Sequence, residues 1–226
     1  MASGLGEANG GPVERGLWLS DAAHRGDLGT FVDHALRLDD SAVIRLRARS
    51  AGLLTAWVAT GFDVLASRVV VGRVRPDDLS VGADALARGL SAIDATGYVD
   101  PGFAMDSAWR GALPPESGFT HLDDVPAGVM LDLAQRGAQL AKDHSSAHGP
   151  PASLLDQEVI RVSSADVSVG VPMRCVFALT AMGFLPQAPV GADELVRVRI
   201  LPSWLRVDAR FGSVYRRRGH PALVLR

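Results

Sequence analysis

The chain has 226 residues, a formal net charge of −2 and 47% hydrophobic residues. These values are typical of a globular protein with a sizeable core, and they exclude a disordered chain. They also exclude a protein attracted as a whole to nucleic acid or to an anionic membrane. Cys175 is the single cysteine, which excludes an internal disulfide and a thiolate zinc site. No apolar run reaches the ~18 residues that span a bilayer, and the first residues lack a signal-peptide pattern. We therefore expect a cytoplasmic protein.

Residues 1–16 are rich in glycine and have no hydrophobic period, which predicts a flexible tail. After it, apolar residues recur at helical spacing from Leu28 to Leu36. Asp27 is placed to cap this helix, and the acidic residues after Leu38 are placed to end it.

A change to alternating apolar and polar residues follows, which predicts an antiparallel meander. The expected strands are 43–49, 53–59 and 62–74, and residues 50–52 suit a three-residue hairpin loop with glycine in the left-handed region. The Pro-Asp-Asp sequence at 76–78 predicts the start of a helix.

Residues 95–124 show no regular pattern, but they carry several aromatic side chains that a floppy linker would not need. Two interpretations stay open: a connection pinned by its aromatics, or a lid over a ligand pocket beneath Trp109. The aromatics are Tyr98, Phe103, Trp109 and Phe119.

A second long helix is expected to follow, with Asp124 as its cap, Pro126 in its first turn and Asp143 near its end. The turn-forming residues after it mark the best candidate boundary in the chain. The remaining elements are expected as strands at 159–163 and 167–171, a helix within 172–184, and strands near 195–201, 204–210 and 213–218.

Together these elements predict an α+β protein in which antiparallel β-meanders pack against helices, with two subregions. The predicted divisions are the flexible tail 1–16, an N-terminal α+β region 17–150 and a C-terminal α+β region 151–226. One continuous domain over both regions is the alternative.

The residues that could act in catalysis or bind a metal do not form a recognisable catalytic or metal site in the sequence. The chain lacks a nucleophile elbow, a phosphate-binding loop and a His-Glu-x-x-His pair. Cys175 has apolar neighbours, which predicts a buried, inert thiol. His121 with Asp123 and Asp124 is explained by helix capping, and His144 and His148 by solvated positions at a helix end. We expect no catalytic residue, metal ligand or cofactor.

The strongest local signal is basic. From Arg174 to the end of the chain there are nine arginines and three acidic residues, a formal balance of +6 in a chain that is acidic overall. If residues 202–203 form a turn, Arg199 lies opposite Arg206, and Arg197 lies opposite Asp208, on the face away from the core. The predicted partner-binding face consists of Arg197, Arg199, Trp204, Arg206, Arg216, Arg217 and Arg218.

The leading functional hypothesis is a non-catalytic cytoplasmic binding or regulatory protein that contacts an acidic protein partner through this arginine face. The alternatives are nucleic-acid binding by the same face, and an enzyme or small-ligand protein with residues 95–124 as its lid. Formation of a homo-oligomer stays open, and no contact with membrane is expected.

Three stretches, WRGALPP (109–115), LDDVP (122–126) and GSVY (212–215), carry a resemblance to a known group. With them the sequence resembles a family of uncharacterised, conserved hypothetical proteins of actinobacteria. The resemblance covers most of the chain after the tail, and it implies no activity, cofactor or functional residue.

Overall fold

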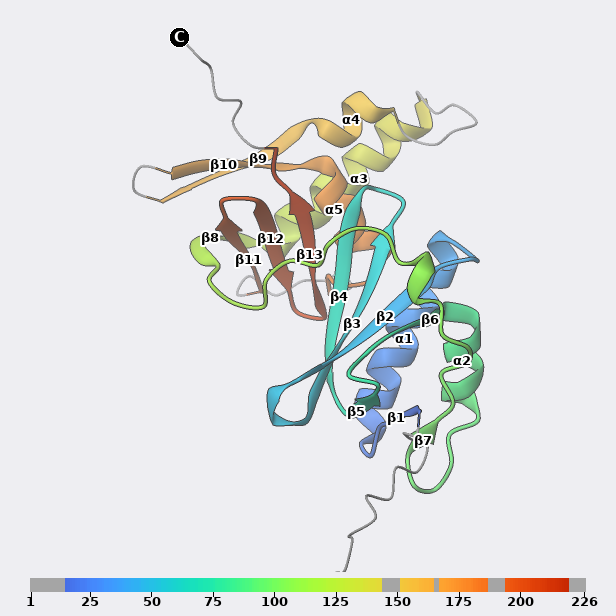
Figure 1. Ribbon diagram of the computed structural model, residues 1–226. Helices are drawn as coiled ribbons and strands as arrows, with labels where there is room; N and C mark the ends of the chain where they lie inside the picture. Colours follow the sequence, from blue (N-terminus) through green and yellow to red (C-terminus); the bar gives the residue numbers. More distant parts are fainter. Residues whose placement is uncertain (1–14, 144–150, 165–166, 187–193, 220–226) are drawn as a thin grey trace, which may run out of the picture.

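The computed structural model describes residues 15–143, 151–164, 167–186 and 194–219 (Figure 1). The helices are α1 (Ala22–Leu38), α2 (Ala83–Ser91), α3 (Ala127–Asp143), α4 (Ala152–Asp156) and α5 (Met173–Ala181), with 3₁₀ turns at Ser50–Gly52 and Asp106–Ala108. The strands are β1 (Gly16–Trp18), β2 (Val43–Arg49), β3 (Leu53–Thr60), β4 (Val64–Val71), β5 (Arg73–Arg75), β6 (Asp78–Gly82), β7 (Tyr98–Val99), β8 (Thr120–Pro126), β9 (Glu158–Ser164), β10 (Val167–Pro172), β11 (Leu195–Leu201), β12 (Trp204–Ala209) and β13 (Gly212–Arg217).

The centre of the fold is an eight-stranded antiparallel sheet with the order β6-β2-β3-β4-β13-β12-β11-β8. The first four strands come from the N-terminal half of the chain and the last four from the C-terminal half. Each half supplies a three-stranded meander and one further edge strand. The fold is therefore α+β with antiparallel meanders and two subregions, as the sequence predicts.

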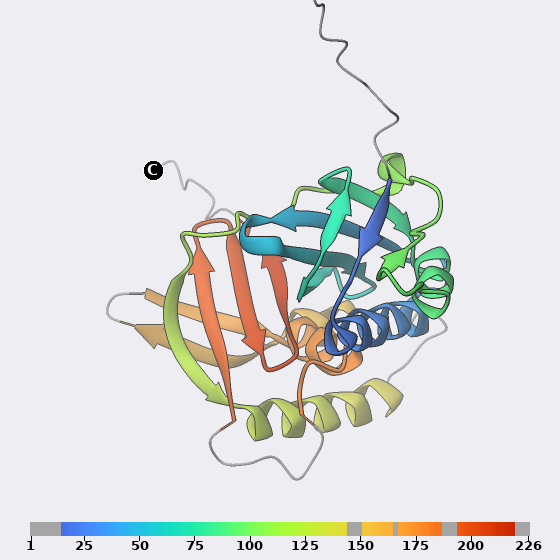
Figure 2. The same cartoon turned by 90° about the horizontal axis from the view of Figure 1, so that it is seen from below.

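The long helices cover one face of this sheet, because each presents one apolar stripe to it (Figure 2). α1 packs on α2 and on β4, while α5 packs on α3 and on β13. Fully buried side chains such as Val198, Val207 and Val214 point from the strands into this layer. We call the opposite face of the sheet, which points away from these α-helices, the outer face.

The two halves meet where β4 pairs with β13, through only three residue pairs. On the helix side of this junction, Phe31 of α1 stacks on Phe184, which follows α5, with ring centroids 6.3 Å apart. Arg68 of β4 adds a polar link, because it pairs with Asp27 of α1 at 2.5 Å and donates a hydrogen bond to the carbonyl of Phe211.

Several local predictions are confirmed. β2 covers the predicted residues 43–49, and the 50–52 loop after it holds Ala51 and Gly52 at positive φ. The predicted turn between β11 and β12 also gives the predicted register, with Arg199 opposite Arg206 and residue 197 opposite 208.

Three local predictions are wrong at their boundaries. α1 begins at Ala22, because Asp21 rather than Asp27 caps it by accepting hydrogen bonds from the backbone of residues 23 and 24. Residues 78–82 form strand β6 rather than a helix, because they pair with β2. Asp124 is not a helix cap, because it lies in β8 opposite Arg197.

The predicted third strand, 62–74, is two strands separated at Gly72. A Cβ at this glycine would lie 2.9 Å from the backbone oxygen of Trp18 and 2.6 Å from the side chain of Leu19. This close approach lets β5 leave the central sheet and pair with β1 in a separate three-stranded sheet, β5-β1-β7.

The predicted tail, 1–16, lies almost entirely outside the described residues, and its last residue, Gly16, begins β1. His144 and His148 also lie outside them. The division of the chain at 150 and 151 stays a prediction. Residues 120–143, on the N-terminal side of that division, nonetheless pair with β11 and pack on α5. Within the described ranges, none of the helices is both long and apolar enough to cross a bilayer.

Candidate functional site: the outer face and its junction pocket

A segment of irregular chain crosses the outer face. Residues 105–119, which we call the strap, connect the two halves over this face (Figure 1). Three of its side chains pack against an aromatic cluster of the sheet that is separate from the main core. The strap is therefore a pinned connection. The strap residues are Trp109, Leu113 and Phe119, and the sheet residues are Trp57, Trp204 and Tyr215.

Beside the strap, the outer face is polar. Pairing across the strands places Ser67 of β4, Ser213 of β13 and Asp208 of β12 in one row. The next row contains Tyr215 of β13 and Arg206 of β12. Since side chains of one row point to the same face, hydroxyl, carboxylate and guanidinium groups are brought together at the junction.

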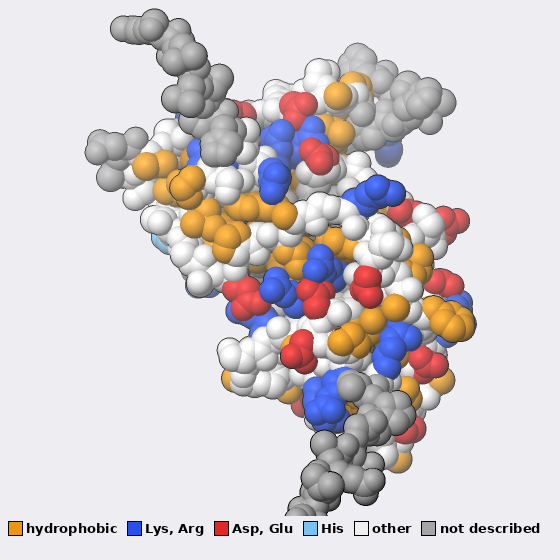
Figure 3. All heavy atoms as spheres, in the orientation of Figure 1, with side chains coloured by type: hydrophobic (Ala, Val, Ile, Leu, Met, Phe, Trp, Pro, Cys, Tyr) orange, Lys and Arg blue, Asp and Glu red, His pale blue; other side chains and the backbone are white. Residues whose placement is uncertain are grey.

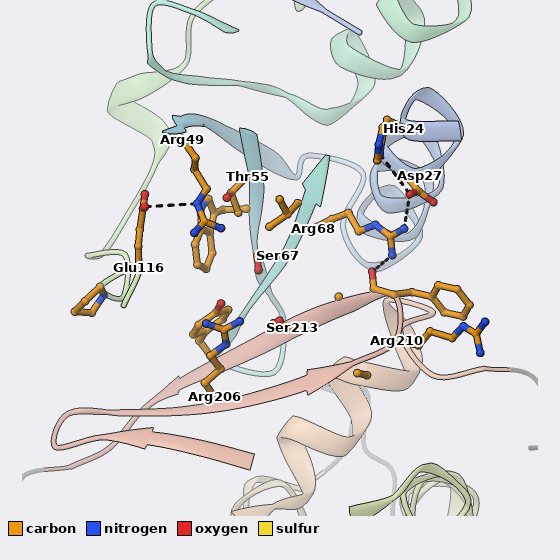
Figure 4. Close-up of a pocket in the computed structure, with 17 residues that line it drawn as sticks. His24, Asp27, Arg49, Thr55, Ser67, Arg68, Glu116, Arg206, Arg210 and Ser213 are labelled. Carbon is orange, nitrogen blue, oxygen red and sulfur yellow. Dashed lines mark hydrogen bonds and ion pairs between the residues drawn. The ribbon is translucent and has the colours of Figure 1, made fainter. Parts of the chain in front are cut away.

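These rows form the floor of a pocket at the end of the β4–β13 pairing. The pairing stops at Ser67 and Ser213, so the two strands separate beyond this pair and leave a notch of about 400 Å³. We call it the junction pocket (Figure 4). It is lined by His24, Asp27, Arg49, Thr55, Trp57, Ser67, Arg68, Val69, Pro115, Glu116, Arg206, Tyr215 and residues 209–213.

Arg206 is held in the pocket by a carboxylate and two aromatic rings. Its Nε donates a hydrogen bond to Oδ1 of Asp208 at 2.6 Å. Its guanidinium also lies over two rings, 5.5 Å from the centroid of Phe119 and 5.4 Å from that of Tyr215. Contacts with a carboxylate and two aromatic rings hold the group in one orientation.

Asp208 organises the charges beneath the pocket. Besides Arg206, it pairs with Arg199 Nη1 at 2.9 Å and accepts a hydrogen bond from the hydroxyl of Ser213 at 2.5 Å. Arg199 and Arg206 face each other across the strands, and the shared carboxylate offsets their repulsion. Burial raises the pKa of the neighbouring Tyr215 phenol, so Tyr215 stays a neutral hydrogen-bonding group at physiological pH.

The strap supplies the opposite wall. Glu116 approaches Arg49 Nε with one carboxylate oxygen at 3.5 Å. Figure 4 shows Thr55, Ser67 and Ser213 between Arg49 on one side and Arg206 on the other. The polar pocket therefore lies beneath residues 115–116, whereas Trp109 covers packed aromatic side chains and Arg45.

The seven residues of the predicted arginine face do not share one surface. Arg197, Arg199 and Arg206 do lie on the outer face, in the predicted register. Arg216 lies on the helix side of β13, opposite Leu205, and pairs with Asp156 at 3.0 Å.

The other three members make contacts within the protein. Trp204 is buried in the aromatic cluster, with Arg217 over its ring at 5.5 Å. Arg218 donates a hydrogen bond to the carbonyl of Leu201 at 3.2 Å. Most arginines of this region therefore contact other groups of the protein, and only part of them faces the pocket.

Sequence reasoning missed the N-terminal contributors to the pocket. Arg49, Ser67 and Arg68 belong to the first meander, and no local pattern indicates that it joins the C-terminal strands. A usable signal was the outward position of Arg49 in its alternating strand, but its partner Glu116 lies in the unassigned segment.

Two other groups that the sequence singles out, Cys175 and the His121–Asp124 pair, lie outside the junction pocket. Cys175 is fully buried, which raises the pKa of its thiol to about 12 and agrees with the predicted inert thiol. His121 and Asp124 form an exposed contact of 2.9 Å on the edge strand β8.

Charges of both signs are mixed on the side of the molecule that carries the outer face. Figure 3 shows Lys and Arg side chains next to Asp and Glu, with apolar side chains between them. Three helices of the helix layer are balanced as well: α1 and α3 each carry two basic and two acidic residues, and α2 carries one of each. The single arginine of α5, Arg174, pairs with Asp156 of α4.

Two family models match this chain. Residues 13–111 match a domain of unknown function (DUF8010), and residues 114–221 match a second domain of unknown function (DUF8185). The change from one to the other falls within the strap, between the two halves of the central sheet. A comparison with curated protein sequences found no match.

Among solved structures, the chain is similar in fold to bacterial DNA polymerase sliding clamps. The clamp of Caulobacter crescentus aligns with a TM-score of 0.54 at 12% identity, covering 94% of this chain and 69% of the clamp. The clamp of Bacillus subtilis gives 0.55 at 11%, covering 93% and 67%. The DNA polymerase beta subunit of Streptococcus pyogenes gives 0.55 at 13%, covering 92% and 65%. The chain spans about two thirds of the length of these subunits. At such identities the similarity concerns the fold alone.

Proposed function

We propose that this chain is a non-catalytic binding protein that holds an acidic segment of a partner protein on the outer face of its sheet. The observation that carries the proposal is the junction pocket, because it combines four lining arginines with hydroxyl groups in a notch of about 400 Å³. Pockets of this size bind small ligands and short segments of larger ones.

The position of the pocket supports binding rather than catalysis. It lies where the two halves join, on a face formed mostly by regular strands, which hold side chains in fixed positions. The strap beside it is pinned by aromatic contacts, so it acts as a wall of the site and not as a lid.

A test compares the two faces of the molecule with a photo-crosslinking residue. Val69 lies on the outer face in the wall of the pocket and is 40% exposed, and Val129 of α3 is 41% exposed on the helix side. We expect a crosslinker at position 69, and not at 129, to capture proteins through acidic segments. An excess of an oligo-glutamate peptide should suppress the capture. Equal capture at both positions contradicts the proposal.

Binding of DNA is the second candidate, and the fold similarity to DNA polymerase sliding clamps favours it. Duplex DNA attracts proteins through clustered Lys and Arg. Here the net charge is −2, helices α1, α2 and α3 each carry equal numbers of basic and acidic residues, and the one arginine of α5, Arg174, is buried and paired with Asp156. Fluorescence anisotropy with duplex DNA decides between the two candidates. Binding at low salt that weakens steeply as salt is added supports DNA as the ligand, and no binding at low salt removes it.

A further inference from the structure

Arg206 has one edge that its neighbours leave free. Asp208 occupies its Nε, and the rings of Phe119 and Tyr215 lie near its guanidinium. Among the described residues, Arg206 donates hydrogen bonds only through Nε, and it lines the junction pocket. Its two terminal nitrogens are therefore available to a ligand in the pocket.

A guanidinium held in this way is a prepared receptor for an oxyanion. Its terminal nitrogens present N–H groups in a planar fork that matches the two oxygens of a carboxylate. Since contacts within the protein already hold the side chain, less side-chain entropy is lost when a ligand binds.

We propose that the junction pocket is a carboxylate receptor, in which Arg206 and Arg49 bind a side-chain or terminal carboxylate of a peptide segment. This inference rests on the proposed function, because it names the group that an acidic partner places on the outer face.

The charge of the pocket selects a monoanion. Counting arginine, aspartate and glutamate and leaving His24 aside, the lining residues and their direct ion-pair partners carry a formal balance of +1, which one carboxylate neutralises and a phosphate dianion exceeds. The basic members are Arg49, Arg68, Arg199, Arg206 and Arg210, and the acidic members are Asp27, Glu116, Glu194 and Asp208.

The remaining lining residues suit a peptide rather than a free ion. Thr55 and Ser67 are buried in the floor and supply hydroxyl groups for further hydrogen bonds. Val69 and Phe211 are part of the wall and keep about two fifths of their surface exposed, at 40% and 38%. They offer apolar contact to a side chain next to the bound carboxylate.

Glu116 acts as a competing carboxylate of the protein itself. It lies 3.5 Å from Arg49 Nε, the cation that the ligand shares with Arg206. An incoming carboxylate must displace Glu116 or share Arg49 with it. Removing the charge of Glu116 should therefore strengthen binding, which a site with a purely structural role does not predict.

The test uses fluorescence anisotropy of a labelled oligo-glutamate peptide with the full chain, and an oligo-glutamine peptide as the neutral probe. Arg206→Gln should weaken binding of oligo-glutamate by about tenfold or more, the value of one lost charge-assisted pair. Arg206→Lys keeps the charge but loses the fork, and should also weaken it. Glu116→Gln should tighten it by about threefold. Arg88→Gln, an exposed arginine of α2 that does not line this pocket, is the control and should change it less than about twofold.

Two results overturn the proposal: Arg206→Gln and Arg206→Lys weaken binding no more than Arg88→Gln does, or Glu116→Gln weakens it. If Arg206→Gln fails to fold, Arg206→Lys and Glu116→Gln decide. Inorganic phosphate that competes better than acetate at equal concentration also overturns the choice of a carboxylate. If the Arg206 variants do not weaken peptide binding but a crosslinker at position 69 still captures acidic partners, the carboxylate receptor is wrong and the proposed function stands. If the peptide binds at Arg206 but no acidic partner is captured at position 69, the receptor stands and the proposed function is wrong.

Discussion

Arg68 should contribute more to stability than an ordinary surface arginine, because it links α1, β4 and the β12–β13 turn. Its side chain is 15% exposed, and it contacts the carboxylate of Asp27 at 2.5 Å and the carbonyl of Phe211. The contact with Asp27, which is 38% exposed, is screened to about 0.5–1 kcal/mol. The hydrogen bond to the carbonyl adds about 1–1.5 kcal/mol and the packed stem about 0.5 kcal/mol. We therefore expect Arg68→Ala to lower the free energy of unfolding by about 2–3 kcal/mol.

Urea unfolding followed by circular dichroism measures this loss, and it should appear as a lower midpoint with an unchanged slope. Arg88→Ala is the matched control. Arg88 pairs with Asp84 at 2.8 Å, but the two side chains are 71% and 56% exposed, so its loss should cost less than about 0.5 kcal/mol. The reasoning is refuted if Arg68→Ala costs no more than Arg88→Ala.

Three further outcomes are expected. Gly89→Ala should destabilise the protein by more than about 1 kcal/mol although alanine favours helices, because the new Cβ would lie 2.0 Å from the backbone oxygen of Asp100. A stabilised variant in thermal unfolding would contradict this close approach. Phe31→Ala should lower the free energy of unfolding in urea by about 3–5 kcal/mol, because it removes the ring that stacks on Phe184. A loss below about 1 kcal/mol would mean that the two halves do not depend on this contact. Cys175 should resist thiol reagents in the folded protein and react on unfolding, and rapid labelling of the native protein would contradict its burial.

The same thiol predicts a pH dependence of stability. Burial raises the pKa of Cys175 to about 12, whereas a thiol in an unfolded chain has a pKa near 8.5. The folded state therefore keeps a proton that the unfolded chain loses. The contribution of this thiol to stability is fully present below about pH 8 and falls as the pH rises from about 8.5 towards 12. Urea midpoints of the natural chain should fall more than those of Cys175→Ala between about pH 8 and pH 10. Parallel curves would count against the raised pKa.

Local patterns were sufficient for the meanders. β11 and β12 alternate between apolar and arginine residues around a two-residue turn, and a slip by one residue would turn Val198 and Val207 to the outer face. The cost of exposing such residues is large, so the register follows from the sequence. The same reasoning gave the opposition of Arg199 and Arg206 at the edge of the pocket.

Local patterns failed where a distant partner decides the conformation. Residues 78–82 resemble a helix start, but pairing with β2 makes them a strand. Asp124 has the local features of a helix cap, yet β11 draws it into β8. In both segments, hydrogen bonds to another strand outweigh an intrinsic preference of a few tenths of a kcal/mol per residue.

The sequence by itself determined the fold class, the two meanders and the concentration of arginine near the C-terminal end, because these depend on composition and on short periodic patterns. Only the tertiary structure decided that β4 joins β13, that the strap crosses the outer face, and that Arg49 and Arg206 line one pocket. These features bring together residues far apart in the chain. Their pairing depends on the shape and burial of whole surfaces, which no local pattern encodes.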